Sequence, residues 1–152
     1  MEKETIDIII AEGQKLSEKK TWLAKGYNDL LAKINEHFAV IPDMDEGEIR
    51  FLLREYKYSP NIYEDWRRRI HVVLVFQNDA FVKLTISKEN EYEWTKEDFE
   101  APTETPTTET IREFATKLPE IMSTFLEEIQ KRNKENREAI NLIENLLKKL
   151  SA

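Results

Sequence analysis

The stretch Ile70-His71-Val72-Val73-Leu74-Val75-Phe76 decides the fold, because it is apolar on both faces of an extended chain and rich in β-branched residues. Strands of this composition lie in the middle of a sheet, where both faces are covered. The sequence therefore predicts that residues 70–76 form a central strand. Upstream, residues 49–54 are expected to form a second strand in which Ile49, Phe51 and Leu53 alternate onto one side.

A turn and a returning strand follow the central strand. Gln77-Asn78-Asp79-Ala80 is typical of a turn, since Asn and Asp tolerate a positive φ. Residues 81–86 then alternate as an antiparallel strand, and Glu91-Tyr92-Glu93-Trp94 is typical of a short edge strand whose charges discourage further pairing. We therefore expect a three- to four-stranded antiparallel sheet over residues 48–94.

A long helix is expected before the sheet, over residues 5–38. Thr5 is suited to cap its start, and Pro42 lies just beyond its end. Residues recur every three or four positions along it as in a coiled-coil seam. The seam positions are Ile9, Gly13, Leu16, Lys20, Leu23, Tyr27, Leu30, Ile34 and Phe38. The two non-apolar members, Gly13 and Lys20, weaken its first half.

The C-terminal third is expected to be a linker followed by a helical arm. Residues 101–108 are rich in Pro, Thr and Glu, and residues 109–150 repeat the spacing of three and four. Thr110-x-x-Glu113 has the form of a capping box. Pro119 predicts either a kink in one long helix or a restart as a second helix. The absence of Gly and Pro from residues 131–136 favours continuity there.

These elements predict an α+β fold in a single domain over residues 1–152. Both helical arms leave the sheet from the same end, so we expect them to pack in coiled-coil manner and to overhang the sheet. The order of elements is similar to that of prefoldin subunits, in which β-hairpins lie between two coiled-coil arms. It also resembles that of RWD domains, whose proline-spaced turn is matched in spacing by Pro102-Thr103-Glu104-Thr105-Pro106, without the preceding Tyr.

Composition limits the class of protein. The chain has 152 residues, 40% hydrophobic and 35% charged, which is enough apolar material for a packed core. It contains no Cys, which excludes disulfides, zinc–thiolate sites and thiol catalysis. No apolar run approaches the roughly 20 residues of a membrane span, and Met1-Glu2-Lys3-Glu4 lacks a signal-peptide pattern. We therefore expect a cytoplasmic protein that does not enter membranes.

The excess negative charge is concentrated in one segment. Residues 89–109 hold eight acidic residues and one basic residue, a net of −7 that equals the net charge of the whole chain. This sign repels phosphates, so we expect no direct contact with nucleic acid. The segment is either a solvated loop that promotes solubility or a docking strip for a basic protein surface. The candidate partner-binding residues of this acidic/aromatic strip are Glu91, Tyr92, Glu93, Trp94, Glu97, Asp98 and Glu100.

One run of three basic residues, Arg67-Arg68-Arg69, follows Trp66. Arg67, Arg68 and Arg69 are candidates for anion contact, because guanidinium groups bind phosphate and stack on bases. The alternative is that they pair with Glu64, Asp65 or the acidic/aromatic strip while their stems cover the sheet edge.

No constellation of residues predicts catalysis. A nucleophilic triad needs a positioned imidazole, and the two histidines, His37 and His71, stand at a helix end and on the central strand, where structural roles are usual. The acidic residues within 43–48 lack the spacing of a calcium loop. Pro42-Asp43 with Glu55-Tyr56-Lys57 can be written as a metal-dependent nuclease pattern, but its halves do not fall on adjacent strand ends. We assign no catalytic residue, metal ligand or cofactor.

Three functions follow, in order of preference. The first is a non-enzymatic protein–protein interaction module, such as an adaptor, chaperone-like subunit or assembly component, that uses the helical seams and the acidic/aromatic strip and forms a homo-oligomer. The alternative is an acidic phage-type inhibitor that blocks a basic nucleic-acid-binding groove of a target protein. The third, a metal-dependent nuclease, is the least favoured because the chain is acidic.

Overall fold

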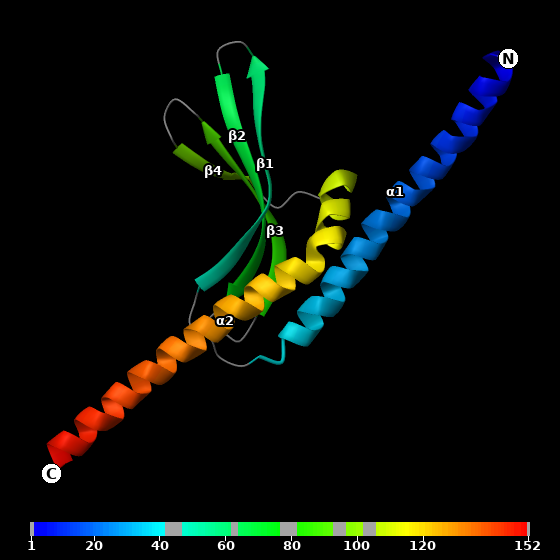
Figure 1. Cartoon of the computed structure of the whole chain (residues 1–152). Coiled ribbons are helices and arrows are strands. Elements are labelled where there is room, and N and C mark those ends of the chain that lie inside the picture. The colour runs from blue at the N-terminus through cyan, green and yellow to red at the C-terminus, as the bar shows by residue number, and fades with distance from the viewer. Residues whose placement is uncertain are drawn as a thin grey trace. The chain divides into compact units, whose positions relative to one another are not determined.

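The computed structural model describes residues 2–41, 47–61, 64–76, 82–92, 97–101 and 106–151. Helix α1 (Glu2–Phe38) leads into four strands, and helix α2 (Thr108–Ser151) follows them (Figure 1). The strands are β1 (Gly47–Asn61), β2 (Glu64–Phe76), β3 (Val82–Tyr92) and β4 (Glu97–Ala101). The predicted α+β class is confirmed, whereas coiled-coil packing of the two helices stays a prediction.

The strands form one antiparallel sheet in the order β1-β2-β3-β4. β2 therefore lies between β1 and β3, which confirms the central position predicted for residues 70–76. The buried residues of this stretch are Ile70, Val72, Val73, Leu74 and Phe76. Because consecutive residues of a strand point to opposite faces, this burial reaches both faces of β2.

The edge of the sheet differs from the prediction. Glu91 and Tyr92 end β3 instead of opening a separate edge strand over residues 91–94, and the edge strand is β4. Ala101, expected to begin the linker, is the last residue of β4. The acidic segment thus contributes backbone to the sheet.

Polar cross-strand contacts hold the part of β3 that the sequence pattern missed. Arg68 Nε donates to Asn90 Oδ1 at 2.7 Å, and Arg69 Nε pairs with Glu89 Oε2 at 3.4 Å. These pairs stabilise neighbouring strands without any apolar alternation, so the alternation that ends at Ile86 marks only part of the strand.

A bulge in β1 decides on which face of the sheet Arg54 lies. Leu52 is opposite His71 whereas Arg54 is opposite Ile70, so Leu53 is an extra residue in β1. Without the bulge, simple alternation would place Arg54 on the same face as Leu52. With it, Arg54 shares the face of Ile70 and reaches the start of α2.

α1 and the first turns of α2 are joined by an aromatic contact. The rings of Tyr27 and Phe114 meet edge to face, with centroids 5.6 Å apart and planes at 84°. Both side chains are buried, as is Ile111 one turn earlier on α2. This contact gives the first part of α2 a fixed neighbour.

Asn35 attaches α1 to the backbone of β3. Its Nδ2 donates to the carbonyl oxygen of Leu84 at 3.2 Å, and its Oδ1 accepts from the Leu84 N–H at 2.6 Å. β4 pairs with β3 only over Lys88–Tyr92, so Leu84 has no strand partner from β4. The Asn35 amide takes the place of that missing strand.

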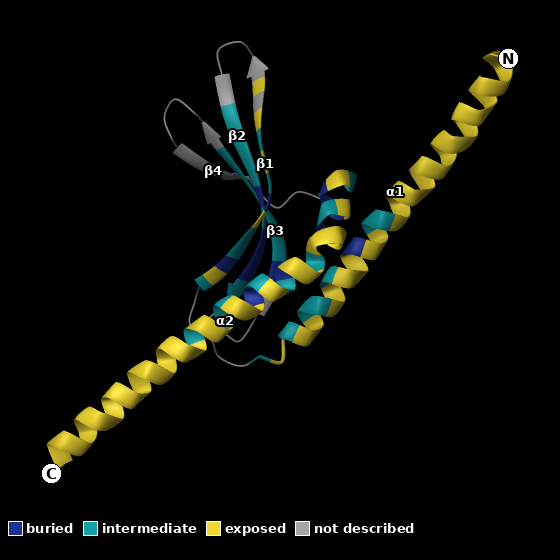
Figure 2. Ribbon diagram, viewed as in Figure 1, coloured by how far each residue is buried: buried dark blue, intermediate teal, exposed yellow. Residues whose placement is uncertain are grey.

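Only the second half of α1 is covered. Its buried or half-buried residues are Leu23, Ala24, Tyr27, Leu31, Ile34, Asn35 and Phe38. Leu31 takes the position that the seam pattern assigned to Leu30, which is 38% exposed. The predicted seam members Ile9 and Leu16 are exposed, as is the rest of the first half (Figure 2).

α2 is one uninterrupted helix, so the two-helix alternative is wrong. Its cap is Thr107, whose Oγ1 accepts from the Thr110 N–H at 3.3 Å and whose carbonyl accepts from the Ile111 N–H at 3.0 Å. The capping box predicted at Thr110-x-x-Glu113 is therefore wrong. The helix starts earlier, at Thr108, and Thr110 is buried inside its first turn.

The chain separates into two compact units, Met1–Thr116 and Lys117–Ala152, and the division falls within α2. Pro119 lies just beyond the division and lacks the N–H that would bond the carbonyl of Ala115. One backbone hydrogen bond of the helix is therefore missing just beyond this division. A single domain over residues 1–152 stays a prediction.

Candidate interaction surfaces

The C-terminal end of α2 is exposed all round (Figure 2), and its exposed residues include a stripe of apolar side chains. This α2 stripe consists of Ile140, Leu142, Ile143, Leu146, Leu147 and Leu150, each more than half exposed. At 3.6 residues per turn the opposite side of the helix carries Asn141, Asn145 and Lys148. The stripe is therefore a one-sided apolar surface.

The α2 stripe is wider than the predicted seam. The spacing of three and four predicted over residues 109–150 ends at Ile143, Leu146 and Leu150, whereas Ile140 and Leu147 add a flank on the next positions. This greater width could be predicted from the sequence, because Leu142-Ile143 and Leu146-Leu147 are adjacent apolar pairs. A narrow coiled-coil seam needs only one apolar residue at each of these places.

Exposed apolar residues on the first half of α1 are arranged differently. They are Ile6, Ile8, Ile9, Ile10, Leu16 and Trp22, all more than half exposed. Successive residues turn by about 100° around a helix, so Ile8 lies on the side opposite Ile6 and Ile10. These residues surround α1 and do not form a single stripe.

The acidic/aromatic strip is divided between two strands. Glu91 and Tyr92 end β3, and Glu97, Asp98 and Glu100 lie on β4, whereas Glu93 and Trp94 lie outside the described residues. Glu91 is opposite Asp98, and Glu89 is opposite Glu100. The register therefore places acidic positions opposite one another on β3 and β4.

The three consecutive arginines face neighbours on the adjacent strands. Arg67 Nε pairs with Glu55 Oε1 at 3.2 Å, Arg68 Nη1 donates to the Tyr56 hydroxyl at 3.2 Å, and Arg69 pairs with Glu89. Arg50 Nη1 pairs with the other oxygen of Glu89. These contacts are with residues of β1 and β3 that the structural alternative did not name, and both that alternative and anion contact stay predictions.

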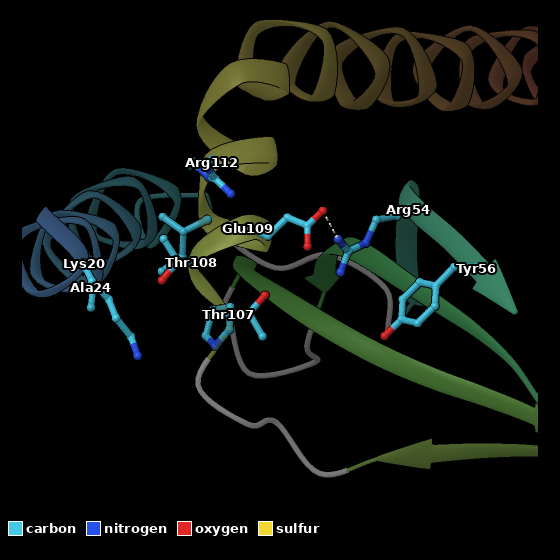
Figure 3. Close-up of a pocket in the computed structure, with 10 residues that line it drawn as sticks. Lys20, Ala24, Arg54, Tyr56, Thr107, Thr108, Glu109 and Arg112 are labelled. Atoms are coloured by element: carbon cyan, nitrogen blue, oxygen red, sulfur yellow. Dashed lines mark ion pairs between the residues drawn. The ribbon is translucent and has the colours of Figure 1, made fainter. Parts of the chain in front are cut away.

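A pocket of about 1060 Å³ lies between α1, β1 and the start of α2, within the first unit (Figure 3). We call it the Arg54 pocket. Its charged lining consists of Lys20 from α1, Arg54 from β1, and Glu109 and Arg112 from α2. The other lining residues are Ala24, Tyr56, Pro106, Thr107, Thr108 and Ile111, so the pocket has both charged and apolar walls.

Arg54 is the central cation of this pocket. Its Nη1 lies 2.8 Å from Glu109 Oε1 and 3.4 Å from Glu113 Oε1, and its guanidinium carbon lies 5.0 Å from the Tyr56 ring centroid. Burial works against the charge, but Glu109 and Glu113 outweigh it and raise the pKa of Arg54 above its ordinary value. Arg54 is therefore held as a cation.

Sequence reasoning missed Arg54, and only part of its environment was visible there. Glu109 and Glu113 are four residues apart and therefore predict two carboxylates on one face of a helix. The bulge at Leu53 that brings Arg54 to that face leaves no trace in the apolar pattern, since Leu52 and Leu53 suit either register.

The two histidines lie on the described part of the sheet and of α1. His71 is half-buried and its Nδ1 has no hydrogen-bond partner, while burial, then Arg50 and Arg69, lower its pKa. His37 is exposed in the last turn of α1, and residues 42–46 lie outside the described residues. Within the described ranges, no three His, Asp or Glu side chains are grouped to hold a metal ion.

No family model, curated protein or solved structure matches this chain. The resemblance to prefoldin subunits and RWD domains therefore concerns only the order of helices and strands along the chain. Among the helical residues that the structure describes, none forms a helix with the length and apolarity needed to cross a bilayer.

Proposed function

We propose that this chain is a non-enzymatic protein-interaction module that assembles through the α2 stripe. The observation that carries the proposal is the continuous apolar side of α2 between Ile140 and Leu150, opposite a polar side. Burying apolar surface is the main favourable term in protein association. A one-sided stripe of this kind is typical of a helix that packs against another helix.

The occupant we propose for the stripe is α2 of a second copy. Asn136, Ile143 and Leu150 are seven residues apart and fall at one seam position, and Ala139 and Leu146 fall at the other. Ile at the first position with Leu at the second favours pairing of two helices, and a single Asn at the first position fixes their register. The sequence of α2 thus carries features of a self-pairing helix.

Sedimentation velocity of the full chain over a wide concentration range tests this proposal. We expect a concentration-dependent oligomer, and Leu146→Asp should weaken it at least about 30-fold, because the new carboxylate would be buried in the contact. Asn145→Asp adds the same charge on the opposite side and should leave the oligomer intact. A monomer at every concentration, or equal effects of the two variants, would overturn the second copy as occupant.

The acidic inhibitor is a second candidate, and the register of β3 and β4 supports it. These strands place Glu91 opposite Asp98 and Glu89 opposite Glu100, within a segment of net charge −7 over residues 89–109. A basic partner surface would be attracted to a segment of this charge. Ionic strength separates the candidates, because a complex held by the acidic/aromatic strip loses affinity steeply as salt is added and an apolar helix contact does not.

A further inference from the structure

The Arg54 pocket is positively charged although the chain as a whole is acidic. Its lining carries Lys20, Arg54 and Arg112 against the carboxylate of Glu109, and Glu113 also pairs with Arg54, which leaves an excess of one positive charge, whereas the net charge of the protein is −7. A concave site concentrates the field of the charges that line it. The pocket is therefore a local attractor for anions.

The three cations come from three elements that the fold brings together. Lys20 is on α1, Arg54 is on β1, and Arg112 is in the first turns of α2 (Figure 3). The aromatic contact between Tyr27 and Phe114, about two turns beyond Lys20 and two residues beyond Arg112, holds the two helices together. The site is thus built on packed elements.

Glu109 occupies the place beside Arg54 that an external anion would take. Its carboxylate points to Arg54 at 2.8 Å, yet its side chain is 61% exposed (Figure 3). Glu113, the other carboxylate on Arg54, is only 26% exposed and lies further away, at 3.4 Å. An exposed ion pair is weak, so Glu109 can turn out to solvent while Glu113 keeps Arg54 in position.

We propose that the Arg54 pocket binds a small organic anion whose phosphate or carboxylate group replaces the Glu109 carboxylate beside Arg54. A guanidinium binds either group through paired hydrogen bonds, and Arg112 and Lys20 supply the further positive charge that a multiply charged anion needs. The volume of about 1060 Å³ is of the size that holds a small organic molecule. This site lies in the first unit, apart in sequence from the α2 stripe in the second, and it goes beyond the assembly proposed above.

Isothermal titration of the full chain with pyrophosphate and, separately, with citrate tests the proposal. We expect saturable binding of at least one probe, and the tighter one shows whether the group recognised is phosphate or carboxylate. Arg112→Gln should weaken binding about tenfold, because it removes one charge from the lining. Glu109→Gln should tighten binding about threefold to fivefold, because it removes the competing carboxylate.

Arg137→Gln is the matched control, because it removes the same charge from an exposed position on the second unit, and it should change binding less than about twofold. If Arg112→Gln does not keep the circular dichroism of the parent, Lys20→Gln on the exposed side of α1 replaces it. The proposal is overturned if neither probe gives saturable heat up to about 10 mM. It is also overturned if Glu109→Gln binds the probe more weakly than the parent, or if Arg137→Gln and the pocket variant lose the same affinity. Sedimentation of Glu109→Gln should match the parent, so failure here is distinct from failure of the α2 assembly.

Discussion

The two ends of α2 have the same apolar spacing but opposite surroundings. Near its start Ile111 and Phe114 are 5% and 1% exposed, whereas near its end Leu146 and Leu150 are 57% and 84% exposed. The first pair has a neighbour in the same unit, because Phe114 meets Tyr27 of α1. Apolar spacing therefore indicates that a helix face is to be covered, and only the fold decides whether the cover comes from the same chain.

The largest expected effect is at the covered end. Phe114→Ala should lower the free energy of unfolding by about 3–5 kcal/mol, because it removes the ring that packs on Tyr27 and leaves a cavity. Urea unfolding followed by circular dichroism measures the change. A loss below about 1 kcal/mol would show that the covered end is no more important to the fold than the exposed end.

The second-largest loss in the free energy of unfolding is expected from removing the hydrogen bonds of Asn35. Asn35→Ala should cost about 2 kcal/mol, because the N–H and the carbonyl of Leu84 both lose their partner in a partly buried place. The control is Asn28→Ala, at an exposed asparagine seven residues before Asn35 on the same helix. It should change the free energy of unfolding by less than about 0.5 kcal/mol. Equal effects of the two substitutions would mean that α1 is not attached through this amide.

The effect of a substitution at the exposed end of α2 on the unfolding midpoint should depend on protein concentration. At dilutions where the chain is monomeric, Leu146→Ala should change the free energy of unfolding by less than about 0.5 kcal/mol, since the side chain is mostly in water. At high concentration the parent should gain stability by mass action and the variant should not. Measuring the unfolding midpoint at both concentrations checks this; a large loss at high dilution would place Leu146 in the core.

The smallest expected effect concerns pH and the sheet. Burial, then Arg50 and Arg69, lower the pKa of His71 in the folded protein, so the unfolded chain, with its ordinary pKa near 6.5, binds the proton more readily. This contribution to stability is complete above about pH 6.5 and is lost as the pH falls below it. His71→Gln should therefore lose less stability than the parent between about pH 7 and about pH 5.5 in urea titrations. The exposed His37→Gln is the control, and identical pH profiles for parent and His71→Gln would contradict the assignment.

Much of the element order could be predicted from the sequence, because it depends on local apolar content. Residues 70–76 are apolar on both faces, and no exposed strand would carry such a run. Likewise, residues 131–136 contain neither Gly nor Pro, so nothing in the chain stops α2 there. Patterns of this kind report burial and propensity directly.

Register and polar pairing could not be predicted in the same way. β1 continues to Asn61 through positions such as Lys57 opposite Arg67, and β3 continues through Asn90, where side-chain hydrogen bonds replace apolar alternation. The Arg54 pocket depends on the bulge at Leu53, whose neighbours are apolar in either register. Long-range geometry of this kind has no signature in a single segment.

The hydrogen bonds of the Asn35 amide affect how the protein would aggregate. While α1 is in place, the backbone groups of Leu84 are satisfied and cannot pair with a strand from another molecule. If α1 detaches while the sheet stays folded, the N–H and carbonyl of Leu84 lose their partners. The edge of β3 is then free to pair with a strand of another molecule. The hazardous species is then a nearly native one, so the rate of aggregation should follow this local opening and not global denaturation.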